Sequence, residues 1–164
     1  GYEESYGYLV GEHARDKDAV LAAMLVAEMT AYYKAQGKDL VQVKEELYAK
    51  FGFYFDKNDS YYLRGKDGAE AIKNIMNDLR KVGKDLMPGI VSMKDYAPGI
   101  DGLPKSDVLK FFFDGGSWLA GRPSGTEPKI KFYYAINKPD EASAVKSYED
   151  MKAIVETYVN KYQQ

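Results

Sequence analysis

The chain has 164 residues, of which 45% are hydrophobic and 29% charged, and its formal net charge is −2. These values fit one globular domain or one and a half small ones, and the negative charge excludes a general electrostatic attraction for nucleic acid or anionic membranes. With no cysteine and a single histidine, the chain cannot form disulfides, thiolate metal sites or a multi-histidine metal cluster.

The first part of the chain is predicted to be a loop followed by a helix. Residues 1–17 are rich in Gly, Glu and Tyr, which is typical of loops and turns. From Asp18 onward a run of Ala, Val, Leu and Met favours a helix, and Gly37 is typical of a helix end. The apolar residues surround this helix instead of forming one stripe, which predicts burial on more than one side.

The remainder of the chain alternates between helical and extended patterns. Asp39, with Gln42 three residues later, is an N-terminal capping pattern for a helix over residues 40–51. Further helices are predicted over residues 67–82 and 140–162, and strands over 53–63 (interrupted by a turn or bulge at 56–60), 90–96, 108–113, 117–120 and 129–136. This order predicts an α+β domain with helices packed on one face of a mainly antiparallel sheet.

A linker is predicted where Gln36, Gly37 and Lys38 separate two helices, which divides the chain into residues 1–38 and 39–164. No apolar run reaches the roughly 20 residues that span a bilayer, so we expect a cytoplasmic protein without a membrane partner. Trp118, at its spacing in the strand pattern, is expected to belong to the core and not to a stacking surface.

The sequence Arg-Pro-Ser-Gly-Thr-Glu-Pro-Lys-Ile-Lys, residues 122–131, collects the groups that bind phosphate. An arginine fork, two hydroxyls and a backbone N–H left uncovered by glycine are donors that a phosphate dianion accepts from. Lys129 and Lys131 are two residues apart, so in an extended strand they share one face. The same residues also fit a hairpin loop whose polar side chains simply satisfy one another.

The order of residues in this stretch closely resembles the phosphate-binding loop in the last domain of the phosphoglucomutase/phosphomannomutase superfamily, the α-D-phosphohexomutases. Glu3-Glu4-Ser5-Tyr6-Gly7 resembles the sugar-binding loop of the same enzymes, which is usually a Glu-x-Ser core between glycines. Residues 13–18 are similar to the segment that follows this loop in phosphoglucomutases. The three segments stand in the family's order along the chain.

The resemblance implies a role for each of eight residues. Glu3 and Ser5 are implied to contact sugar hydroxyls, although without the resemblance they fit a solvated acidic terminus. Lys17 is implied to be an acid/base group or an electrostatic helper near the reacting oxygens, although it also fits an ordinary lysine at a helix start. The residues implied to bind phosphate are Arg122, Ser124, Gly125, Thr126 and Lys131.

The resemblance covers the end of the family's third domain and the whole of its fourth, so it implies a C-terminal fragment of a phosphoglucomutase. The parent enzyme is expected to interconvert glucose 1-phosphate and glucose 6-phosphate through a phosphoserine and a bisphosphate intermediate, with Mg²⁺ and glucose 1,6-bisphosphate as cofactors. The serine and Mg²⁺ loops of the family precede these segments, so we expect this chain alone to be inactive and to bind neither cofactor. It begins with Gly1 instead of Met, and we expect its partners to be a sugar phosphate and the missing N-terminal domains of the same polypeptide.

Other functions remain open on the sequence. A phosphopentomutase of the same superfamily has a similar sugar loop, and a phosphomannomutase of that superfamily is a further alternative. A stand-alone phosphate-binding module would need only residues 122–131. A sheet with aromatic residues and lysines is also found in RNA-binding domains, although the net negative charge argues against a nucleic-acid partner.

Overall fold

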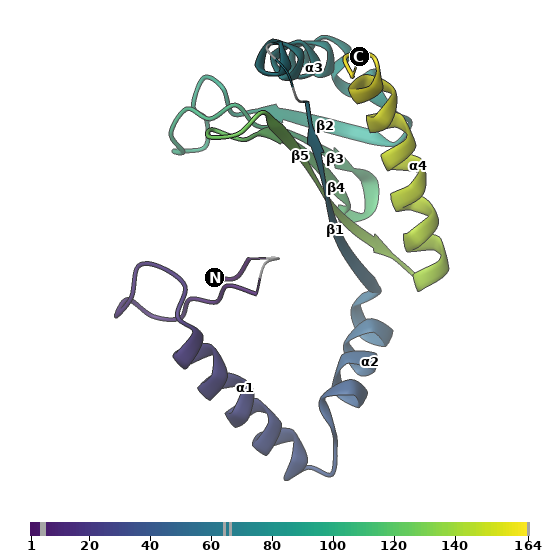
Figure 1. Cartoon of the computed structure of the whole chain (residues 1–164). Coiled ribbons are helices and arrows are strands. Elements are labelled where there is room, and N and C mark those ends of the chain that lie inside the picture. Colours follow the sequence, from purple (N-terminus) through teal and green to yellow (C-terminus); the bar gives the residue numbers. More distant parts are fainter. Residues whose placement is uncertain (4–5, 64, 66, 164) are drawn as a thin grey trace. The chain divides into compact units, whose positions relative to one another are not determined.

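The computed structural model of the protein describes residues 1–3, 6–63, 65 and 67–163. Its contacts divide the chain into two compact units, Gly1–Phe51 and Gly52–Gln164, which are described separately below (Figure 1). The division lies further along the chain than the predicted boundary between residues 38 and 39. The helix over residues 40–51 groups with the first unit because only its Val43 is buried, and Gly52, at φ 91°, turns the chain before the first strand.

The first unit contains a long loop and two helices, α1 (Ala19–Lys34) and α2 (Leu40–Phe51). The Asp18 carboxylate accepts hydrogen bonds from the backbone N–H of Val20 and of Leu21, which caps the start of α1. The predicted capping pattern of α2 is confirmed. The Asp39 N–H donates to Gln42 Oε1 at 2.9 Å, and the Gln42 N–H donates to Asp39 Oδ1 at 2.8 Å.

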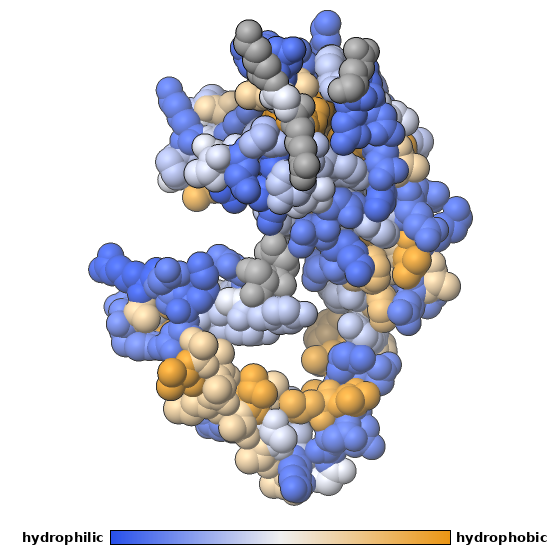
Figure 2. All heavy atoms as spheres, in the orientation of Figure 1, coloured by the Kyte–Doolittle hydropathy of each residue, from blue (hydrophilic) through white to orange (hydrophobic). Residues whose placement is uncertain are grey.

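Helix α1 buries none of its residues, although its sequence predicts burial on more than one side. Figure 2 shows apolar side chains gathered over this helix. The most exposed large ones are Val20, Met24, Val26, Met29 and Tyr32. The described part of the chain contains no helix that combines the length and the apolar character needed to cross a membrane.

The second unit is a five-stranded antiparallel sheet with the strand order β1-β5-β4-β3-β2. Its strands are β1 (Phe53–Tyr62), β2 (Ile90–Asp95), β3 (Leu109–Phe113), β4 (Trp118–Pro123) and β5 (Lys129–Lys138). Two helices, α3 (Gly68–Val82) and α4 (Glu141–Asn160), cover one face of the sheet, and short 3-10 turns, η1 (Gly83–Leu86) and η2 (Asp114–Gly116), follow α3 and β3 (Figure 1). This arrangement confirms the predicted α+β fold.

The core lies between the sheet and the two helices. Along β5 the side chains alternate, so that Ile130, Phe132, Tyr134 and Ile136 are buried beneath the helices while the residues between them face the other side. Helix α3 adds an apolar stripe of Ile72, Ile75, Met76 and Leu79. Each such side chain stabilises the fold by about 1.5–3 kcal/mol through the apolar surface that it removes from water. Among the described residues of this unit, no helix covers the opposite face of the sheet, called here the open face.

Two predictions about the sheet are wrong. Strand β1 is continuous and pairs with β5 along its whole length, without the turn or bulge predicted at residues 56–60. An edge strand tolerates these polar residues because water or a neighbouring element can satisfy them, and Tyr148 of α4 bonds to Asp59. Trp118 lies outside the core, half-exposed, because its register opposite Phe112 and Ala135 places it on the open face.

A group of tyrosines and carboxylates lies where α4 crosses β1 and β5. The Tyr148 hydroxyl donates to the carboxylate of Asp59 at 3.0 Å, and the Tyr61 hydroxyl donates to Glu156 at 3.3 Å. The Tyr134 hydroxyl is buried and has no hydrogen-bond partner within the described part of the chain. Burial raises the pKa of Tyr134 far above its ordinary value, so this hydroxyl stays protonated.

We expect Tyr134→Phe to leave the free energy of unfolding unchanged or to raise it by up to about 1 kcal/mol, because a buried unpaired hydroxyl is costly. Tyr148→Phe should lower it by about 1–2 kcal/mol, because that hydroxyl bonds to a carboxylate. Urea unfolding of both variants measures the difference. Equal losses in the two variants would contradict this account and would show that Tyr134 has a partner such as a bound water.

Candidate functional site

The candidate loop connects β4 to β5. Strand β4 is longer than predicted, because it continues through Arg122 and Pro123. The Ser124 N–H donates to the carbonyl of Lys129 at 2.8 Å, which closes the hairpin. The Lys129 N–H donates to the carbonyl of Glu127 at 2.7 Å, and the Lys129 ammonium pairs with the Glu127 carboxylate. The second half of the loop therefore satisfies its own polar groups, as an ordinary hairpin would.

The first half of the loop borders a hollow of about 360 Å³. The hollow brings together all five of the residues that the sequence assigns to phosphate. Its lining consists of Arg122, Pro123, Ser124, Gly125, Thr126, Lys129, Lys131 and Tyr133. The side-chain hydroxyl of Ser124 accepts only a long bond of 3.4 Å from the Thr126 N–H, so its own proton is available to a ligand.

Two cations of this hollow stand side by side without a counter-charge. Arg122 on β4 lies directly opposite Lys131 on β5 in the register of the sheet. Neither forms an ion pair with any carboxylate of the described residues. Like charges directly opposite each other on a sheet are destabilising. An anion bound between them would relieve this repulsion and accept hydrogen bonds from both.

Gly125 is not required by the shape of the loop. Its φ is not positive, and a Cβ added to it would meet no atom within 4 Å. Neither backbone strain nor packing therefore explains a glycine at this position. A ligand that approaches the backbone N–H closely would explain it, because any side chain would stand in its path.

The other side of the same loop faces helix α3 across a second hollow of about 490 Å³. Lys73 of α3 and Asp107, which precedes β3, line this hollow together with residues 123–128. Neither residue belongs to a motif of the sequence. Lys73 occupies an ordinary exposed helix position, and Asp107 belongs to a loop far away in the sequence, so no local pattern marks them.

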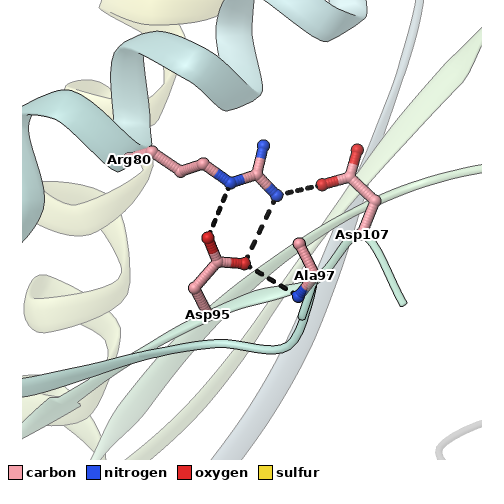
Figure 3. Close-up of polar contacts among 4 residues, drawn as sticks. All are labelled: Arg80, Asp95, Ala97 and Asp107. Atoms are coloured by element: carbon pink, nitrogen blue, oxygen red, sulfur yellow. Dashed lines mark hydrogen bonds and ion pairs between the residues drawn. The ribbon is translucent and has the colours of Figure 1, made fainter. Parts of the chain in front are cut away.

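Arg80 of α3 holds the loop that connects β2 to β3, as Figure 3 shows. Its Nε donates to Asp95 at 2.8 Å, and its Nη2 donates to both Asp95 and Asp107. Asp95 also accepts from the Ala97 N–H at 3.0 Å. Burial acts to raise the pKa of Asp95, but the bonds from Arg80 and Ala97 outweigh it and keep the pKa below its usual value. This clamp fixes the two ends of the loop over residues 96–107.

The first unit carries the other predicted site residues. Ser5 lies outside the described residues. Glu3 and Lys17, from separate segments, lie close together, with 3.6 Å between Lys17 Nζ and Glu3 Oε1. Lys17 also contacts Asp16 Oδ1 at 3.0 Å. The Glu3 N–H donates to the carbonyl of Gly7 at 2.8 Å, which places these two residues next to each other.

Gly7 allows Lys17 to reach this loop, because a Cβ on Gly7 would lie only 2.4 Å from Lys17 Cγ. The hydrogen bond to Asp16, followed by the charges of Asp16 and Glu3, raises the pKa of Lys17 above its usual value. Lys17 is therefore an ammonium at neutral pH. In that state it can donate a proton or a hydrogen bond, but it cannot act as a base.

The described residues do not fit a metal ion. No group of three or more His, Asp or Glu side chains among them converges as a metal site requires. The sequence pairs Asp67-Gly68, Asp101-Gly102 and Asp114-Gly115 belong to separate turns. No step of the chemistry is therefore assigned to Mg²⁺ at these residues.

Two family descriptions match the chain in sequence order. Residues 1–51 match "Phosphoglucomutase/phosphomannomutase, alpha/beta/alpha domain III". Residues 63–152 match "Phosphoglucomutase/phosphomannomutase, C-terminal domain". The first match ends where the first compact unit ends, at Phe51.

Curated relatives are similar over most of this chain. A phosphoglucomutase of Staphylococcus haemolyticus (strain JCSC1435) is 36% identical over 149 residues, which are 83% of this chain and 27% of the relative. A phosphoglucomutase of Staphylococcus aureus (strain MRSA252) is 37% identical over 153 residues, or 85% of this chain and 27% of the relative. This chain therefore spans about a quarter of the length of these relatives.

A solved structure has the same fold. The crystal structure of the open form of the exocytosis-sensitive phosphoprotein pp63/parafusin, a phosphoglucomutase from Paramecium, covers 98% of this chain with a TM-score of 0.71. The matched part is 30% of that protein, and the two sequences are 19% identical there. This likeness concerns the fold alone.

Proposed function

Since the chain belongs to the phosphoglucomutase/phosphomannomutase family, we propose that it is the C-terminal part of a phosphoglucomutase that interconverts glucose 1-phosphate and glucose 6-phosphate. In this proposal residues 52–163 bind the phosphate group that does not react, and residues 1–51 bind sugar hydroxyls. The phosphoserine, Mg²⁺ and glucose 1,6-bisphosphate belong to the intact protein, which we expect to be cytoplasmic. This chain alone is inactive.

The observation that carries the proposal is the pair of cations Arg122 and Lys131, which lie in one hollow with the donors of the loop and form no ion pair with a carboxylate of the described residues. The Arg122 fork can bind two phosphate oxygens, and Lys131 adds a second positive charge. The hydroxyls of Ser124 and Thr126 and the N–H of Gly125 can take the remaining oxygen lone pairs. A loop whose polar groups all satisfied one another would leave no such set of donors.

The first unit supports the sugar-binding part of the proposal through Glu3 and Lys17. A carboxylate such as Glu3 can accept hydrogen bonds from two adjacent hydroxyls of a sugar. Lys17 holds Glu3 by charge and, as an ammonium, serves as an electrostatic helper or a proton donor to a phosphate oxygen. We assign Ser5 to the same group on the family resemblance alone.

The proposal is tested by turnover. A longer polypeptide that contains this chain should form glucose 6-phosphate from glucose 1-phosphate when Mg²⁺ and glucose 1,6-bisphosphate are present. The 164-residue chain under the same conditions should form no more product than a mock purification. Product formed by the chain alone would contradict the assignment as a fragment.

The sugar specificity of the longer polypeptide is tested by comparing glucose 1-phosphate with ribose 1-phosphate as substrates. A higher kcat/KM for glucose 1-phosphate than for ribose 1-phosphate supports a phosphoglucomutase. The reverse order would make the parent a phosphopentomutase. Mannose 1-phosphate as the best of the three substrates would make it a phosphomannomutase.

A further inference from the structure

A second concave site lies on the open face, where the loop over residues 96–107 folds back against the start of β3. The Tyr96 N–H donates to the carbonyl of Val108 at 2.9 Å, and the Ser106 N–H donates to the carbonyl of Tyr96 at 3.1 Å. Beside these bonds lies a shallow, open groove of about 360 Å³ whose lining is almost entirely apolar. Its lining consists of Tyr96, Leu103, Pro104, Ser106, Val108 and Lys110.

The groove is held in shape by the Arg80 clamp described above (Figure 3). Arg80 ties Asp95, one residue before Tyr96, to Asp107, one residue before Val108. Both ends of the loop are therefore fixed to helix α3. A ligand that enters the groove would not have to order these ends, which lowers the entropy cost of binding.

Lys110 is the single charged residue of the groove. Its Nζ lies 3.8 Å from the ring centroid of Trp118 and 5.2 Å from that of Phe112. It forms no ion pair with any carboxylate in the part of the chain that the structure describes. Its contacts with the two rings are favourable, but they leave the ammonium without an anionic acceptor.

The neighbour across the sheet makes this charge more costly. Lys94 of β2 lies directly opposite Lys110 in the register, and its ammonium forms an ion pair with Asp101 at 2.7 Å. Burial first, and then repulsion from Lys94, lowers the pKa of Lys110 below its usual value. Lys110 is thus a partly desolvated cation that an incoming anion would stabilise.

We propose that this groove binds a small amphipathic anion. Its anionic group pairs with the Lys110 ammonium, and its apolar body, about the size of one ring, packs against Leu103, Pro104 and Val108. The groove's volume is at the small end of the range for ligand sites. The site is separate from the loop over residues 122–131 and does not depend on the function proposed for it.

The chain supplies its own reporter, because Trp118 is its one tryptophan and carries Lys110 over its ring. The test titrates the 164-residue chain with benzoate, which combines a carboxylate with a ring, and follows the emission of Trp118. Acetate presents the anion without the ring, and benzyl alcohol presents the ring without the anion. Benzoate should give a saturating change at concentrations about tenfold lower than either control.

Two variants separate Lys110 from general charge effects. Lys110→Met removes the ammonium but keeps most of the unbranched side chain, and it should weaken benzoate binding by about tenfold or more. Lys57→Met is the matched control, because Lys57 lies 5.6 Å from the ring centroid of Phe55 on another strand, and it should change nothing. Since Lys110→Met also alters the surroundings of Trp118, amide chemical shifts of Leu103 and Val108 provide a second readout.

Excess inorganic phosphate tells the two sites apart. If benzoate binds at Lys110, its titration should be unchanged when phosphate is present. Competition by phosphate, with amide shifts at Ser124 to Thr126, would show that benzoate enters the other loop and would overturn the proposal. Equal binding of benzyl alcohol and benzoate, or equal losses in the Lys110 and Lys57 variants, would overturn it as well.

Discussion

Replacing Arg122 with alanine is expected to weaken the binding of inorganic phosphate to the 164-residue chain by about tenfold or more. The guanidinium borders the hollow beside Ser124 and Thr126, and its cross-strand neighbour is Lys131, which likewise has no ion pair within the described part of the chain. The starting affinity should be no better than about millimolar, because a few charge-assisted bonds must offset the entropy of association.

Two further variants make this prediction specific. Arg122→Lys should restore only part of the affinity, because an ammonium cannot present the planar fork of a guanidinium. Lys138→Ala, at the far end of β5 and outside the hollow, is the matched loss of one positive charge and should have little effect. Equal weakening by Lys138→Ala and Arg122→Ala would show that phosphate responds only to the overall charge.

Gly68→Ala is expected to lower the free energy of unfolding by at least about 2 kcal/mol. A Cβ on Gly68 would lie 1.8 Å from the carbonyl oxygen of Leu63 and 3.6 Å from Cβ of Pro128. Neither neighbour can move freely. Leu63 is buried and its N–H donates to the Pro128 carbonyl at 3.0 Å, so the backbone itself must shift to accept a methyl group.

Gly125→Ala provides the matched control for this prediction, because a Cβ there meets no atom within 4 Å. Urea unfolding should show an unchanged midpoint for Gly125→Ala and a clear loss for Gly68→Ala. In a phosphate titration, Gly125→Ala should bind phosphate more weakly than the unsubstituted chain, although its stability is unchanged. A Gly68→Ala protein as stable as the unsubstituted chain would mean that the start of α3 is not packed as described.

Local sequence patterns predicted most of the fold. The stripe of α3, the capping residues of α2 and the alternation along β5 are all set by neighbours in the chain, and each was found. The predictions failed where a distant partner decides the outcome. The polar residues of β1 remain in a strand because β5 pairs with them, and Trp118 lies on the open face because of its register.

The candidate phosphate site could be read from the sequence because its donors stand within ten consecutive residues, and a hairpin keeps such residues together. The groove at Lys110 could not be predicted from the sequence. It depends on a loop that Arg80 holds from another element, and on a ring that comes from the next strand. No spacing in the sequence reports these contacts.

The central claim is that residues 122–131 form a phosphate site, and a phosphate titration followed by amide chemical shifts tests it most directly. The account predicts that the amides of Ser124, Gly125 and Thr126 shift together and saturate with one dissociation constant, and that Arg122→Ala moves this response to phosphate concentrations about tenfold higher or more. If those amides stay in place while Glu3 or scattered surface lysines respond, the loop is part of the scaffold and the claim is contradicted.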